Sequence, residues 1–210
     1  MFRKVQHHLL WREAVLVSFP LSVLRVTLAA YLWPRFIVFQ GLVAKPLHAR
    51  QGITAGIFSA TCELKALLVR KLDELTVRHG NITFNMHVDD VTIDGHGKKR
   101  NEHLLRVEDA ANDTAHVLED QLLLPLATEK AAAVGNDSEL VALCAKRLGE
   151  IGGRPAEVVR NLGIDFPSRG GTIRRWGGGG KSGGGGRTGK GVFIVIFCLM
   201  DYPPGGYPGG

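Results

Sequence analysis

The spacing of apolar and polar positions along the chain changes at Gly80. From Ile57 up to this glycine, apolar residues recur every three or four positions with charged residues between them, which predicts a long amphipathic helix. Glycine suits the position just after the last helical turn. We therefore expect the longest helix of the protein to end here.

Beyond Gly80, apolar and polar residues alternate. The alternation runs over residues 82–88 and resumes over 91–94, which is typical of two strands with one buried face. Only Asp89 and Asp90 separate the two runs. The sequence therefore predicts a tight hairpin with two carboxylates at its tip.

The other predicted elements are shorter and lie on both sides of this helix and hairpin. Helical spacing, proline and glycine breaks, and short β-branched runs indicate them. We expect, in chain order, helices over 7–18 and 21–31, two strands around a Gln40-Gly41 turn within 35–47, a helix over 102–124, a strand over 130–134, a helix over 140–148 capped within 136–139, and a strand or hairpin over 158–166.

Composition divides the 210 residues at about residue 170. The last 41 residues hold 16 of the 27 glycines and carry a net charge of +4 out of the total of +6. Glycine loses the most backbone entropy on ordering and has no side chain to bury. We expect one α+β domain over 1–169 and a disordered glycine-rich tail over 170–210, with no regular structure after Ser168.

The cysteines and the N-terminal residues exclude several classes of protein. The three cysteines are widely spaced. The odd number of cysteines, without a CxxC pair, favours neither a disulfide framework nor a zinc module. No signal peptide is recognisable, so an intracellular protein, cytoplasmic or nuclear, is expected. Residues 14–39 are apolar, but Arg25, Pro20 and Pro34 interrupt them. We favour a buried helical pair there over a membrane anchor, and expect no stable membrane association.

The two adjacent aspartates of the hairpin are the first candidate for chemistry. Two ionised carboxylates held close together repel each other unless a cation lies between them, and Mg²⁺ prefers carboxylate and phosphate oxygens. The alternative is an ordinary turn, because aspartate is common in turns. The predicted order of elements, helix, strand, Asp-Asp, strand, helix and strand, matches a split βαβ arrangement that lacks its first strand.

Several segments over roughly residues 1–169 form an ordered set of motifs. The segment Gln51-Gly52-Ile53-Thr54-Ala55-Gly56, which stands before a long helix, resembles the glycine-containing motif of the reverse transcriptases of retroelements. His87-Val88-Asp89-Asp90 is similar to that family's aromatic-x-Asp-Asp box, and Lys130 and the segment Asn161-Leu162-Gly163-Ile164-Asp165-Phe166 are similar to its later palm lysine and primer-grip turn. The order and spacing of these motifs are more specific than any one of them.

The resemblance implies a fold and a reaction. The fold would be a reverse-transcriptase-like palm (ferredoxin-like) with partial fingers and the start of a thumb connection. The reaction would be two-metal nucleotidyl transfer with Mg²⁺ or Mn²⁺. Asp89 would be a metal ligand, Asp90 its partner, and Lys130 a candidate acid or charge partner beside the departing phosphate.

The resemblance also implies the partners and their binding residues. An RNA template, a DNA primer and deoxynucleotides would bind, with Gln51 and Gly52 beside the template and the incoming nucleotide. Phe2 would stand at the aromatic position that borders the sugar.

Two departures from the family pattern predict impaired catalysis. The box has His87 where the family has an aromatic residue. The family also carries a metal-binding aspartate a few residues before the aromatic that Phe2 matches, so the chain is expected to be N-terminally truncated. The alternative function is a non-catalytic, nucleic-acid-binding remnant.

Overall fold

The computed structural model describes residues 2–54, 57–87, 90–96, 100–135, 137–156, 158–161, 164–167 and 192–198. Helices and strands alternate along these residues, so the expected mixed α+β class is confirmed. The chain divides into two compact units. The first contains residues 1–74 and 117–125, and the second contains residues 75–116 and 126–210.

The first unit is mainly helical. A 3-10 turn, η1 (Phe2–Lys4), leads into α1 (His7–Leu16) and α2 (Leu21–Leu32), which contact each other. Both predicted helices are confirmed, and Pro20 at the N-cap of α2 starts the second one. Among the described residues no helix is long and apolar enough to cross a membrane.

A short hairpin follows α2. Its strands β1 (Val38–Phe39) and β2 (Leu42–Val43) are antiparallel, and the predicted turn is confirmed, since Gln40 and Gly41 both have positive φ (48° and 81°). Every residue from 32 to 48 is exposed. The apolar stretch 14–39 is therefore buried only in part, because the hairpin is exposed and so are Val15 and Leu16 of α1 and Val23 and Val26 of α2.

The long predicted helix is α3 (Ala60–Arg78), which begins three residues later than expected. Its Leu64, Leu67 and Leu68 are buried, as are Leu10 of α1 and Leu24 of α2. The leucine spacing of three and four residues thus marks the buried face of the helix.

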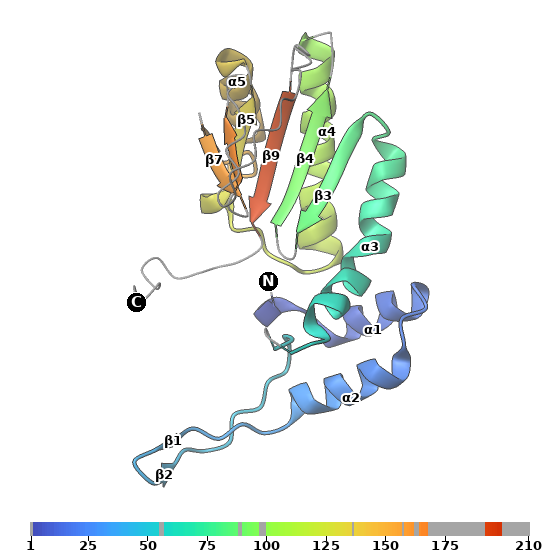
Figure 1. Cartoon of the computed structure of the whole chain (residues 1–210), viewed down its shortest axis with the longest axis vertical. Helices are drawn as coiled ribbons and strands as arrows, with labels where there is room; N and C mark the ends of the chain where they lie inside the picture. The colour runs from blue at the N-terminus through green and yellow to red at the C-terminus, as the bar shows by residue number, and fades with distance from the viewer. Residues whose placement is uncertain are drawn as a thin grey trace, which may run out of the picture. The chain divides into compact units, whose positions relative to one another are not determined.

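The second unit is built on a five-stranded sheet with helices packed on it (Figure 1). The sheet order is β3-β4-β9-β5-β6. The elements, in chain order, are β3 (Ile82–His87), β4 (Asp90–His96), α4 (Arg100–His116), β5 (Ala132–Gly135), α5 (Ser138–Leu148), β6 (Arg154–Pro155) and β9 (Val192–Cys198).

The hairpin of β3 and β4 is confirmed, with its turn displaced by one residue. His87 pairs with Asp90, so Asp90 is the first residue of β4 and not part of the turn. The connection therefore consists of Val88 and Asp89, which lie outside the described residues.

Three boundaries after the hairpin differ from the predictions. Helix α4 ends at His116, and a π-helical turn, η2 (Val117–Gln121), takes up the rest of the apolar pattern. Lys130 does not begin a strand but ends a 3-10 turn, η3 (Thr128–Lys130), because the Lys130 and Ala131 N–H groups donate to Ala127 and Thr128. The strand then begins at Ala132.

Helix α5 and its predicted cap are confirmed, and the helix begins two residues earlier than expected, at Ser138. The Asp137 side chain accepts a hydrogen bond of 3.1 Å from the N–H of Leu140, so Asp137 is the N-cap. Asn136, at the start of the predicted capping segment, lies outside the described residues. Gly149 closes the helix with a positive φ of 57°, as expected.

Two predictions concern the C-terminal part of the chain. The hairpin expected over 158–166 is confirmed as β7 (Val158–Asn161) and β8 (Ile164–Pro167), although its turn at Leu162-Gly163 is outside the described residues. The expectation of no regular structure after Ser168 is wrong for Val192–Cys198. This apolar, β-branched and aromatic run forms β9, while residues 168–191 and 199–210 lie outside the described residues.

Candidate functional site

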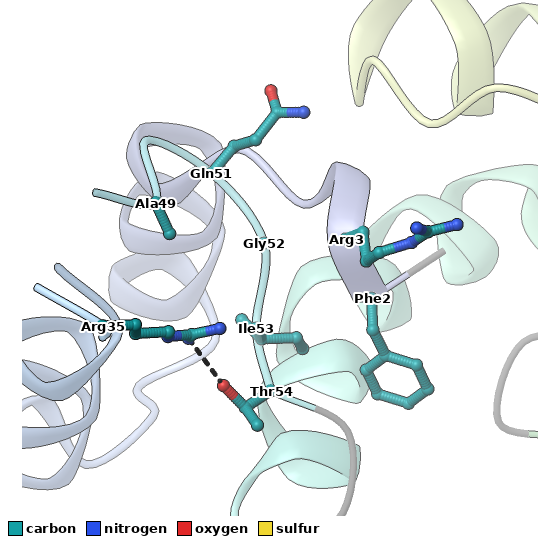
Figure 2. Close-up of a pocket in the computed structure, with 8 residues that line it drawn as sticks. All are labelled: Phe2, Arg3, Arg35, Ala49, Gln51, Gly52, Ile53 and Thr54. Atoms are coloured by element: carbon teal, nitrogen blue, oxygen red, sulfur yellow. Dashed lines mark hydrogen bonds between the residues drawn. The ribbon is translucent and has the colours of Figure 1, made fainter. Parts of the chain in front are cut away.

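The structure brings Phe2, Gln51 and Gly52, the three predicted substrate-binding or template-binding residues, into one pocket of the first unit. Its volume is about 390 Å³. Figure 2 shows the residues that line it. The complete lining consists of Phe2, Arg3, Arg35, Ala49, Gln51, Gly52, Ile53 and Thr54. Residues that are about 50 positions apart in sequence therefore share one cavity.

Main-chain hydrogen bonds hold the loop of the pocket on the N-terminal segment. The N–H of Gly52 donates to the carbonyl of Val5 (2.7 Å), and the N–H of Ile53 donates to the carbonyl of Phe2 (2.8 Å). The Nε2 of His7 donates to the carbonyl of Gly52 (2.7 Å). These bonds fix the loop against residues 2–7 on both sides of Gly52.

Gly52 is the residue that this geometry requires. Its φ is +91°, a backbone conformation that L side chains rarely adopt. A Cβ at this position would lie 3.0 Å from the Cα and carbonyl oxygen of Arg3. The glycine therefore allows both the bend of the loop and its close approach to the N-terminal turn.

Polar side chains of the pocket point in different directions. The Gln51 side chain points away from Thr54 (Figure 2) and accepts a hydrogen bond of 2.7 Å from Gln6. Arg35 donates to the hydroxyl of Thr54 (3.1 Å) on the opposite side of the loop. An antiparallel bridge between Arg35 and Leu47 places this arginine beside the segment that leads into the pocket.

The charges around the pocket favour an anionic ligand. Among the described residues that line it, two are arginines and none is acidic. The sequence has no Asp or Glu from Ala14 to Cys62, and Arg25, Arg35, Lys45 and Arg50 lie in this stretch. A surface of one sign attracts ligands of the opposite sign.

Three polar side chains, His7, Tyr31 and Glu63, contact one another in series, and His7 also contacts the loop. The ring of His7 stacks on Tyr31 with centroids 6.1 Å apart, and Tyr31 donates to Glu63 (2.8 Å). Tyr31 and Glu63 are both buried. Burial, followed by the hydrogen bond to Glu63, raises the pKa of Tyr31 far above its ordinary value.

In the second unit, Asp90 and Lys130 lie at the same end of the sheet. Asp90 pairs with Cys198 at the end of β9, and β5 begins at Ala132, opposite Ile196 of the same strand. The turn η3, which ends at Lys130, contacts β9. The two predicted catalytic residues are thus on the two sides of the end of β9.

The residues of this sheet end fit a magnesium ion in part. Asp90 is half-buried at the start of β4, and a carboxylate oxygen is the ligand type that Mg²⁺ prefers. The second predicted ligand, Asp89, lies outside the described residues. The described part of the chain contains no group of three His, Cys, Asp or Glu side chains placed to hold a metal.

Sequence reasoning did not identify Arg35 or Thr54 as residues of the pocket, or His7 as a residue that holds its loop. Arg35 and His7 belong to segments whose periodicity predicts only a strand and a helix. Their role depends on the bridge to Leu47 and on the carbonyl of Gly52, two contacts between distant segments. In the sequence, the absence of Asp and Glu from 14 to 62 was the one feature that could have indicated a basic site in this region.

Comparisons of the chain with models of protein families, with curated proteins and with solved structures find no match.

Proposed function

We propose that this chain is a fragment of an RNA-directed DNA polymerase of the reverse-transcriptase kind, with weak nucleotidyl-transfer activity. One observation carries the proposal: Phe2, Gln51 and Gly52, matched to substrate-binding or template-binding positions by motif, line one pocket. Motifs that matched only by chance would have no reason to converge in space.

The pocket has the chemistry that an incoming nucleotide needs. Phe2 offers an aromatic wall, and Gly52 lets the loop bend and pack closely on Arg3, which keeps Gln51 and Ile53 at the pocket. The guanidinium of Arg35 suits a phosphate, which an arginine binds through several N–H groups. Thr54 orients this guanidinium by accepting one of its hydrogen bonds.

The sheet end of the second unit has the kinds of charged group that such a reaction needs. Asp90, together with Asp89, would hold Mg²⁺ or Mn²⁺, which stabilises the attacking and leaving oxygens of phosphoryl transfer. Lys130, at the same end of the sheet, would neutralise charge on the departing pyrophosphate. The order β3-β4-β9-β5 supports a palm assignment, since β9 takes the position of the first strand of a split βαβ sheet.

One observation favours the second candidate function, a non-catalytic nucleic-acid-binding protein. Strand β9 has the sequence VFIVIFC and therefore brings no carboxylate to the sheet beside Asp90. A polymerase palm needs a further aspartate on that strand, so this sheet would have fewer ligands than a fully active centre. The protein would then bind a nucleic-acid template without catalysing nucleotidyl transfer.

Primer extension on an RNA template with the full chain tests the proposal. Extension that needs Mg²⁺ or Mn²⁺, disappears in Asp89→Asn and Asp90→Asn, and is unchanged in Asp109→Asn, is expected. Asp109 is an exposed aspartate of α4 and serves as the matched control. Salt-dependent RNA binding without extension would establish the second candidate. Absence of both RNA binding and extension would contradict both candidates.

A further inference from the structure

Strands β4 and β5 are separated by one strand, β9, and the place that β9 fills between them is called the gap below. Helix α4 and the residues after it connect the two strands, and both pair antiparallel with β9, so they run parallel to each other. They are not hydrogen-bonded neighbours in the sheet. Without β9 each would expose a row of unpaired N–H and C=O groups, which is a template for another strand.

The register shows that this gap is shaped for one particular strand. Phe193 pairs with Gly95 on one side and with Gly135 on the other. The largest residue type of β9 is therefore placed in a row with two glycines. A Cβ at Gly95 would lie 2.7 Å from side-chain atoms of both His103 and Val107, so helix α4 keeps this position small.

Both edges of the gap have support that does not come from β9. Strand β4 pairs with β3 along six residues, and α4 packs on both of these strands. Strand β5 pairs with β6, and α5 packs on both. Figure 1 shows β9 between these two groups of elements. If β9 left the gap, β3 and β4 would still pack on α4, and β5 and β6 would still pack on α5.

The sequence that connects β9 to the rest of the chain is long and rich in glycine. Residues 168–191 link it to β8, and 12 of these 24 residues are glycine. A chain of this length can span at most roughly 80 Å. Asp90 and its partner Cys198 are 108 positions apart, so no local turn determines which copy of the chain supplies the strand.

We propose that β9 is an exchangeable strand, and that the gap between β4 and β5 accepts Val192–Cys198 of a second copy as well as its own. The ligand of this surface is an extended, uncharged, apolar strand with an aromatic residue at the position that pairs with Gly95 and Gly135. Backbone hydrogen bonds on both sides provide the affinity, and the glycine row provides the register. The proposal is independent of nucleotide or metal binding.

Cleavage of the connection in the full chain tests the exchange. A recognition sequence for a site-specific protease is inserted between Gly178 and Gly179, and the cleaved protein is passed over a sizing column. The fragment with β9 is expected to co-elute with the rest of the chain. A labelled synthetic peptide of residues 190–200, with added terminal lysines for solubility, is then expected to replace it.

A peptide with Ile194→Pro is the matched control. Proline removes a hydrogen-bond donor from a strand that is paired on both sides, so replacement is expected to be about tenfold weaker or more. Separation of the fragment at once after cleavage would overturn the proposal. It would also be overturned by a fragment that stays bound and never exchanges with the peptide, or by equal replacement by both peptides.

Intact copies provide a second measurement. Two full-length samples with different fluorescent labels at the C-terminus and on β3 are mixed at high concentration and then diluted. Energy transfer between copies that grows over time and is absent for Ile194→Pro is expected. Transfer that is absent in the wild type at every concentration would contradict exchange between copies, whether or not RNA extension is observed.

Discussion

The hydroxyl of Tyr31 donates a 2.8 Å hydrogen bond to Glu63, and both side chains are buried. Within the described residues, the other carboxylate oxygen of Glu63 has no hydrogen-bond partner. The tyrosine is thus the partner that makes burial of this carboxyl group tolerable. Through the stacked ring of His7, the pair also lies behind the loop that carries Gly52.

The Tyr31 hydrogen bond predicts a stability change at high pH. Its pKa is raised by burial and by Glu63, so the folded protein keeps the proton above pH 10, where an unfolded tyrosine loses it. The unfolded state then binds fewer protons, and the free energy of unfolding falls by about 1.4 kcal/mol per pH unit. Urea unfolding between pH 8 and 11 measures this slope.

Tyr31→Phe is the comparison for that titration. It removes the hydroxyl and leaves the buried Glu63 without its partner, at a cost of about 1–3 kcal/mol at pH 7. The difference in stability between wild type and variant is expected to shrink above pH 10. A constant difference from pH 8 to 11 would show that Tyr31 titrates equally in both states.

Alanine at three glycines separates backbone strain from steric contact. Gly80→Ala is expected to be neutral or slightly stabilising, because φ is ordinary there and no atom lies within 4 Å of the new Cβ. Gly41→Ala should cost about 1–2 kcal/mol from its positive φ alone. Gly52→Ala should cost more, since strain and contact with Arg3 combine. Chemical denaturation gives the order, and equal costs at Gly41 and Gly52 would refute the close packing.

Cys62 and Cys144 should differ in reactivity. Cys62 is exposed, whereas Cys144 is buried, and burial raises the pKa of its thiol to about 12. Because the thiolate is the reacting form, alkylation at pH 8 is expected at Cys62 and not at Cys144 until the protein unfolds. Mass spectrometry of tryptic peptides locates the label. Rapid labelling of Cys144 under native conditions would contradict the packing of α5.

The buried Glu13 connects α1 with α3. It accepts hydrogen bonds from Arg12 and from Arg70, with the closest Arg70 contact at 2.6 Å. Arg70→Met should destabilise the protein by up to about 3–5 kcal/mol, because the carboxylate stays buried and loses a charge partner. Arg106→Met breaks an exposed pair with Glu102 and should cost only about 0.3–0.5 kcal/mol. Equal costs in thermal unfolding would show that Glu13 is hydrated.

The sequence predicted the elements with strong periodicity better than it predicted their neighbours. Helix α3 and the hairpin of β3 and β4 were foreseen, since their spacing reflects the faces that Leu64, Leu68 and Ile82 bury. The position of Asp90 was displaced by one residue, because strand ends depend on cross-strand pairing with His87 and not on alternation. Lys130 was misplaced for a similar reason, the local turn bonds of η3.

The central strand β9 could not be predicted from composition. Glycine enrichment over 170–210 predicts a segment without its own core, but Val192–Cys198 pairs with strands formed about 60 and 100 residues earlier. Pairing at that separation leaves no local signal beyond β-branched and aromatic residue types. The pocket could not be predicted for the same reason, because Arg35 and Gly52 are distant in sequence and meet only in the folded protein.

Photo-crosslinking of an azido-substituted deoxyadenosine triphosphate to the full chain tests the central claim most directly. Ultraviolet irradiation followed by mass spectrometry is expected to locate the adduct on peptides that contain Phe2 or residues 49–54. Excess deoxynucleotide should suppress the adduct, and Gly52→Ala should reduce it. An adduct confined to other segments, or one that excess deoxynucleotide does not suppress, would contradict the assignment of this pocket to a nucleotide.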